Sequence, residues 1–204
     1  MNYKIHSFRH AEIILNNEVS YKKVWNELLE TIKNIKDNEI IEKYESNSRK
    51  AKSISEAINN ILKEKLIKLG WNDESCIFQD DEYTGNRWRL DFAKESISVE
   101  VAFNHGEAIA WNLIKPVLAS ELNHVKKEID TEVGVIICAT KDLKEKGGFD
   151  GAVGEYEKFL TYLSPLRDIL SVPIALIGLE APESFSIEVK IINGKKQGIV
   201  KKKN

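Results

Sequence analysis

The sequence predicts an α/β fold in which a central mixed β-sheet is flanked by α-helices. Residues 135–139 and 174–179 are short, continuous apolar runs, which are typical of strands buried on both faces. The segments before and between these runs instead repeat apolar residues at the spacing of a helix. A sheet with helices packed on it is the simplest arrangement that buries both kinds of segment. A chain of 204 residues is predicted to form one domain, residues 1–204.

Apolar stripes at helical spacing predict two helices in the first seventy residues, over 24–35 and 54–69. Ser53 and Glu56 are spaced as a capping box at the start of the second helix. The polar residues 37–52 between the two stripes are predicted to form a mobile connection.

Two further helical stripes and a basic C-terminus complete the outline. One stripe, over residues 118–129, follows Pro116, which suits a first turn or a kink, and the other covers residues 153–163. The lysine-rich residues 195–204 are predicted to be a solvated, mobile tail rather than a binding arm.

The period of the apolar residues changes to two over 88–92 and 97–103, which predicts an antiparallel hairpin. Strand parity places Asp91 and Glu100 side by side on this hairpin. Adjacent carboxylates repel each other unless a cation lies between them, and hard oxygen ligands suit Mg²⁺. From this pattern alone, two ordinary surface acids on a solvated hairpin face are an equal alternative.

The overall composition argues against a membrane protein and gives no direct sign of a nucleic-acid binder. No apolar run approaches the roughly 18 residues of a membrane-spanning helix, and the N-terminus lacks the apolar centre of a signal peptide. The net charge of −2 does not exclude DNA binding, because a positive field need only line one cleft. Two cysteines are too few for a disulfide framework or a zinc site, and Cys138 lies in an apolar run as a buried thiol. A cytoplasmic protein without a membrane partner is expected.

Five segments, in the same order over residues 10–180, resemble the BglII and BstYI branch of the PD-(D/E)XK nucleases. Each segment is short, and their common order makes the resemblance specific. They are His10-Ala11 leading to Ile14-Leu15-Asn16, Lys63-Glu64-Lys65-Leu66 to Gly70-Trp71, Asp91-Phe92 with Glu100-Val101, Ser120-Glu121-Leu122 before residues 135–140, and Val172-Pro173-Ile174 to Ile177-Gly178-Leu179.

The resemblance implies a restriction-endonuclease-like core and a type II site-specific deoxyribonuclease. Such an enzyme is a homodimer that encloses palindromic double-stranded DNA and cuts each strand once, leaving 5′-phosphates. The host would carry a cognate DNA methyltransferase, with which no direct contact is expected.

The resemblance also implies a metal site and a mechanism. Carried over residue by residue, Asp91 and Glu100 would hold Mg²⁺, with Mn²⁺ as a substitute, and the backbone carbonyl of Val101 would be a further ligand. Glu74, shortly after Trp71, is a candidate outer carboxylate because relatives carry an acidic or amide residue there. The reaction would be metal-assisted hydrolysis.

One position departs from the family pattern. Two residues beyond the glutamate, the superfamily places Lys and this branch places Glu or Gln, but this chain has Ala102. A methyl group can neither orient water nor stabilise charge, so the chain either recruits another group or is altered or impaired. His105, Glu107 and Lys115 are nearby substitutes, although none has the register of the strand. For catalysis we prefer to interpret His105 as a loop residue and Lys115 as a charge on a helix face.

Two segments are candidates for contact with DNA bases, because in the resembled group the corresponding segments enter the major groove. They are Asn104 with His105, and residues 144–154. Asn suits adenine and Lys suits guanine, so the residue types fit. Glycines in the second segment would let its backbone approach the bases, although a flexible surface loop explains them equally well. The named DNA-binding candidates are Asn104, His105, Lys144, Lys146 and Asp150.

Two other functions remain open. Ala102 is compatible with a catalytically impaired or non-cleaving DNA-binding protein on a nuclease fold. A structure-directed repair or recombination nuclease is the second alternative. Cutting of a plasmid with Mg²⁺ or Mn²⁺ would distinguish a restriction endonuclease from the non-cleaving protein. Discrete fragments, instead of branch-dependent cutting, would distinguish it from the repair nuclease.

Overall fold

A six-stranded sheet forms the centre of the molecule, with the strand order β1-β6-β5-β4-β3-β2. The computed structural model describes residues 1–46, 51–79, 81–83, 85–121, 130–192 and 194–203. Strands β4, β5 and β6 are parallel, whereas β1, β2 and β3 join antiparallel, so the sheet is mixed as predicted. The strands are β1 (Tyr3–Phe8), β2 (Asn72–Cys76), β3 (Arg89–Lys94), β4 (Ile97–Ala102), β5 (Val133–Ala139) and β6 (Ile174–Leu179).

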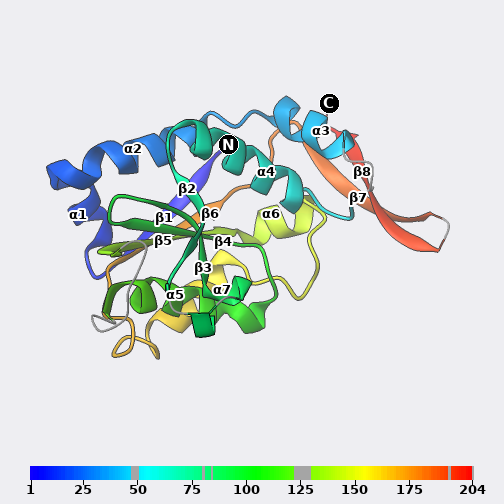
Figure 1. Ribbon diagram of the computed structural model, residues 1–204. Coiled ribbons are helices and arrows are strands. Elements are labelled where there is room, and N and C mark those ends of the chain that lie inside the picture. Colours follow the sequence, from blue (N-terminus) through cyan, green and yellow to red (C-terminus); the bar gives the residue numbers. More distant parts are fainter. Residues whose placement is uncertain (47–50, 80, 84, 122–129, 193, 204) are drawn as a thin grey trace.

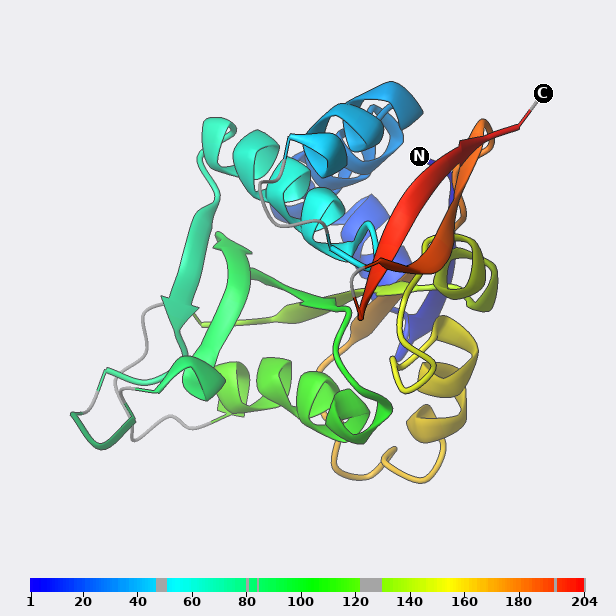
Figure 2. The ribbon, with the colours of Figure 1, turned by 90° about the vertical axis from the view of Figure 1, so that its right-hand side faces the viewer.

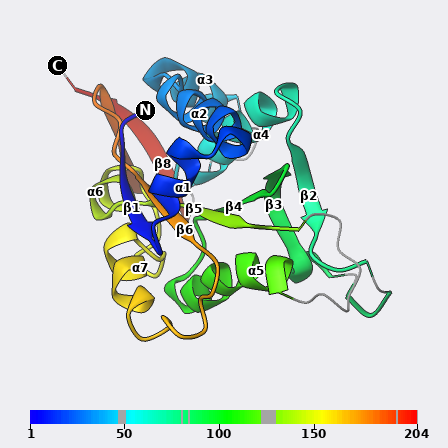
Figure 3. The same cartoon turned by 90° about the vertical axis from the view of Figure 1, so that its left-hand side faces the viewer.

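The central strands β4, β5 and β6 are buried along their whole length because helices cover both faces of the sheet. Figure 1 shows α1 to α4 on one face and α5 with α7 on the other, and Figures 2 and 3 show the same layers from either side. The α/β prediction is confirmed. The helices are α1 (Ala11–Asn17), α2 (Val19–Lys33), α3 (Asp37–Glu45), α4 (Ser55–Lys68), α5 (Ile109–Glu121), α6 (Lys141–Lys146) and α7 (Tyr156–Leu163), with short 3-10 turns at Asp81–Tyr83, Asn86–Trp88 and Gly106–Ala108. None of the described helices is long and apolar enough to cross a membrane.

The prediction of a mobile connection over residues 37–52 is wrong for its first part. Helix α3 occupies Asp37–Glu45, because Ile40, Ile41 and Tyr44 form a buried stripe on an otherwise polar helix. Residues 47–50 lie outside the described part of the chain. The predicted capping box is also wrong, since α4 begins at Ser55 and no side chain caps its first turn.

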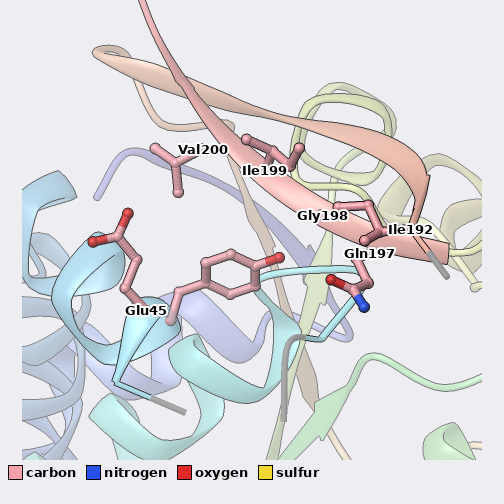
Figure 4. Close-up of a pocket in the computed structure, with 7 residues that line it drawn as sticks. Glu45, Ile192, Gln197, Gly198, Ile199 and Val200 are labelled. Carbon is pink, nitrogen blue, oxygen red and sulfur yellow. The ribbon is translucent and has the colours of Figure 1, made fainter. Parts of the chain in front are cut away.

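The prediction of a mobile basic tail is wrong as well. Residues Lys195–Lys202 form strand β8, which pairs with β7 (Phe185–Ile192) in a separate two-stranded sheet. Gly198 lets β8 lie close to the backbone of Lys52, because a Cβ at position 198 would be only 2.6 Å from the Lys52 carbonyl oxygen. A cavity of about 380 Å³ lies between β8 and the end of α3 (Figure 4), and no residue predicted for the active site lines it.

Helix α5 starts before Pro116, rather than behind it as the sequence suggested. It spans Ile109–Glu121 with the proline inside, and residues 122–129 of the predicted stripe lie outside the described residues. Pro116 packs directly on Gly134 of β5, where a Cβ would lie only 2.6 Å from the proline ring. The glycine therefore lets α5 lie close against the sheet at this point.

Candidate active site

Asp91 and Glu100 lie next to each other on the hairpin of β3 and β4. The neighbouring pair Phe92 and Val99 sets the register. The Val101 amide donates a hydrogen bond of 2.6 Å to Asp91 Oδ2, and the Asp91 amide donates one of 3.3 Å to Glu100 Oε1. The predicted adjacency of the two carboxylates is confirmed. Because Glu100 is only 3% exposed, the alternative of two surface acids does not describe this pair.

Lys115 joins the two carboxylates from helix α5. Its Nζ lies 2.7 Å from Glu100 Oε2, and its side chain is only 10% exposed. The interpretation of Lys115 as no more than a charge on a helix face is therefore wrong, because α5 turns this residue toward the sheet. The sequence did contain a signal, since Lys115 is the one charged residue within 109–120, and lysine is rarely buried unless it is paired.

The electrostatics of the site favour a bound cation. Burial, and then the neighbouring Asp91, raise the pKa of Glu100 to about 8, while Lys115 acts to lower it. Burial also raises the pKa of Asp91, against the opposing effect of the hydrogen bond from Val101. Two buried carboxylates that share one lysine would be more fully neutralised by an additional positive ion.

The donor set fits a hydrated Mg²⁺ better than a metal held entirely by protein. In the described part of the chain, no group of three or more His, Cys, Asp or Glu side chains is arranged to hold a metal. Mg²⁺ usually keeps several waters and takes only one or two carboxylates, which two acids and the Val101 carbonyl would satisfy. The residues present therefore fit the ion that the resemblance implies.

Glu74 lies at the edge of this site on β2. The register of β2 with β3 places it opposite Asp91, and its negative charge contributes to the raised pKa of Asp91. Its side chain is half exposed, and one oxygen lies 3.7 Å from Arg89 Nη1. Glu74 also has a φ of 53°, a conformation that a non-glycine residue rarely adopts. The exposed carboxylate of Glu74 therefore fits the predicted outer position at the edge of the metal site. It is not buried beside Glu100.

We expect the stability of the metal-free protein to fall as pH rises from about 5 to about 8. The pKa of Glu100 is near 4.5 in the unfolded chain and about 8 in the fold, so the folded state binds more protons in this window. The groups that face Glu100 are Asp91 on β3 and Lys115 on α5, while Glu74 and Lys63 act on Asp91. The free energy of unfolding of wild type should decrease on the order of a few kcal/mol over this window, and Glu100→Gln should remove that decrease. Urea unfolding at each pH measures it.

The matched control for this measurement is Glu145→Gln, which removes an exposed acid on α6 and should leave the pH dependence unchanged. Equal slopes for wild type and Glu100→Gln would contradict the assignment.

The structure brings the two candidate DNA-reading segments together. The Gly106 amide donates to the Ala152 carbonyl at 2.7 Å, and the Gly154 amide donates to the Asn104 carbonyl at 3.0 Å. His105 and Val153 form a β-bridge between these bonds. The Asn104 side chain accepts a hydrogen bond of 2.9 Å from the buried Asn112, so its position is fixed by α5.

The other DNA-binding candidates already have partners within the chain. Lys144 pairs with Glu155, Lys146 pairs with Asp142 one helical turn earlier, and Asp150 pairs with Lys52 at 2.8 Å. The Lys52 hydrogen bond and the Ala152 amide lower the pKa of Asp150 to about 2. The alternative of a flexible loop over 144–154 is therefore wrong at its start, where α6 includes Lys144 and Lys146.

Most glycines of this segment are explained by packing inside the protein. A Cβ at Gly147, Gly148 or Gly154 would lie 2.7, 2.6 or 3.0 Å from other atoms of the chain. Only at Gly151, among the four, does a Cβ meet no atom within 4 Å. Gly151 is thus the one position of the four where backbone could approach another molecule without first displacing protein.

Comparison with known proteins gives a family and solved structures of similar fold. The family model for restriction endonuclease BglII/BglIII matches residues 3–179. The crystal structure of restriction endonuclease BglII complexed with a DNA 16-mer is similar, with 21% identity over 99% of this chain and 91% of that chain and a TM-score of 0.68. The structure of free BglII has the same identity and coverage and a TM-score of 0.55. No curated protein sequence matches.

The family match spans most of the chain, and the fold is similar to that of the solved BglII structures. It includes both hairpin carboxylates and the helix that carries Lys115. The chain therefore belongs to the restriction endonuclease BglII/BglIII family, and it is a type II site-specific DNA endonuclease.

Proposed function

We propose that this chain cuts palindromic double-stranded DNA by Mg²⁺-dependent hydrolysis, leaves 5′-phosphate ends, and accepts Mn²⁺ in place of Mg²⁺. The observation that supports the proposal most is the buried pair of Asp91 and Glu100, whose raised pKa values indicate a site that needs positive charge. A pair of acids on the surface would be solvated by water and would not need a bound cation to offset its charge.

The chain's own residues divide the work of this reaction. Asp91, Glu100 and the Val101 carbonyl would hold the ion, and Glu74 would act from the outer edge. When bound, the ion supplies a water of lowered pKa and a positive charge opposite the attacked phosphate. The hydrogen bonds from the Val101 and Asp91 amides fix the two carboxylates before substrate arrives.

We further propose that the chain acts as a homodimer. Palindromic DNA has a twofold axis, and one chain with one carboxylate pair needs a symmetry-related copy to cut both strands. The solved relative is described as BglII complexed with DNA, which supports double-stranded DNA as the substrate. Asn104, His105 and the adjoining residues up to Gly154 would face the bases, while Lys144 and Lys146 would contact phosphates. A cognate methyltransferase would protect host DNA in the cytoplasm without contact with this chain.

The test is digestion of a sequenced, supercoiled plasmid with Mg²⁺, with Mn²⁺, and with a chelator. We expect discrete fragments with both metals and none with chelator, and ligation of the products should require no added kinase because their ends carry 5′-phosphates. DNA binding without any nicking would indicate the non-cleaving alternative. Cutting only at branched substrates would indicate the repair nuclease, and either result would overturn the proposal.

A further inference from the structure

Strand β4 leaves no room for a long side chain at position 102. Ala102 is 1% exposed and belongs to the apolar cluster that also contains Ile109 and Leu113 of α5. A lysine, glutamate or glutamine at this position would have to displace buried neighbours in this cluster. The alanine therefore matches the position of α5, and the polar group that the strand lacks has to come from elsewhere.

Helix α5 brings such a group to the carboxylates. Lys115 lies on the same helix as Ile109 and Leu113, and its Nζ is 2.7 Å from Glu100 Oε2. An ammonium group has three donors, so the bond to Glu100 leaves others for a second acceptor. The atom that Lys115 contacts belongs to the same carboxylate that would hold the metal, so the ammonium lies within the reaction site and not beside it.

The packing of α5 sets the position of Lys115. The next residue, Pro116, contacts Gly134 on β5, and any side chain at 134 would push the helix outward. Gly134 is paired in register with Ser98, two residues before Glu100 on the neighbouring strand. The contact between Pro116 and Gly134 thus fixes the helix at the point where Lys115 must reach Glu100.

We propose that Lys115 supplies, from helix α5, the polar group that strand β4 lacks at Ala102, and that its ammonium contacts the scissile phosphate during cleavage. This inference rests on the proposed function. It identifies the chain as a competent enzyme whose active-site lysine comes from a helix instead of the strand. A purely structural role would be neutralisation of Glu100 alone, and the experiment must separate the two.

The test compares Lys115→Met with wild type in single-turnover cleavage. We expect the rate to fall on the order of 10²–10⁴-fold. DNA binding with Ca²⁺ in place of Mg²⁺ should stay within about threefold of wild type, and Mn²⁺ affinity should not fall, because the carboxylates remain and a competing positive charge is removed. The matched control is Lys94→Met, which removes another ion-paired, largely buried lysine (2.6 Å from Glu27) and should leave the cleavage rate unchanged.

Chemical rescue distinguishes a lost charge from a disturbed fold. Lys115→Cys, aminoethylated with 2-bromoethylamine, places an ammonium at nearly the same distance from the backbone. Its cleavage rate should be at least tenfold higher than that of unmodified Lys115→Cys. Wild type treated in the same way controls for modification of Cys76 and Cys138. If wild type cuts DNA and Lys115→Met cuts it equally fast, this inference alone is overturned. An absence of rescue in aminoethylated Lys115→Cys would have the same consequence. A wild type that cuts no DNA would overturn the proposed function together with it.

Discussion

Asp91→Ala and Glu100→Ala are each expected to reduce single-turnover DNA cleavage by roughly 10³-fold or more. A bound metal contributes several kcal/mol of transition-state stabilisation, and each ~1.4 kcal/mol is a factor of about ten in rate. Either substitution removes one of the two carboxylates that would hold the ion, and with it one of the negative charges and one of the few protein ligands that the site offers. Asp91→Ala also removes the acceptor of the Val101 amide, which lies 2.6 Å away.

The control for these variants lies on the same hairpin. Glu95 is an exposed acid in the turn between β3 and β4, with a φ of 52°. Glu95→Asn removes its charge, and Asn tolerates this left-handed conformation. We expect wild-type cleavage from Glu95→Asn. Cleavage near the wild-type rate in Asp91→Ala or Glu100→Ala would show that the reaction does not depend on this pair.

Ala102→Gln and Ala102→Glu are expected to lower the stability of the protein and leave the cleavage rate equal or lower. Either side chain would bury a polar group against Ile109 and Leu113 of α5, at a cost of about 1–3 kcal/mol. For a chain of this size the melting temperature should fall by roughly 3–10 °C. Displacement of α5 would also move Lys115 away from Glu100.

The opposite result at Ala102 is equally informative. If the alanine is a lesion in an otherwise ordinary active site, restoring the family's Gln or Glu should raise the rate by on the order of 10²-fold. A gain of that size in either variant, measured in single turnover against wild type, would show that Lys115 does not replace the missing group.

The sequence was sufficient for the parts of the fold that have strong local patterns. Continuous apolar runs predicted β5 and β6, and period-two alternation predicted the β3–β4 hairpin. Helix α3 and strand β8 were missed because their polar residues dominate the pattern, while their burial depends on partners far along the chain. Strand β1 was missed for a related reason. It is a short strand at the edge of the sheet, and the first seventy residues were predicted to be helical.

The active site shows the same limit. Strand parity is a local property, so it predicted that Asp91 and Glu100 are adjacent. The position of Lys115 depends on how α5 packs on the sheet, which requires the tertiary contact between Pro116 and Gly134. The sequence placed Lys115 among three nearby substitutes but favoured a charge on a helix face, and its contact with Glu100 followed only from the structure.

The most direct measurement of the central claim is isothermal titration calorimetry with Mn²⁺ on wild type, Asp91→Ala, Glu100→Ala and Glu95→Asn. The carboxylate pair is predicted to hold the ion, so wild type and Glu95→Asn should bind Mn²⁺ with the same affinity. Asp91→Ala and Glu100→Ala should both lose that binding. Wild-type affinity in either alanine variant would contradict the assignment of the metal to Asp91 and Glu100.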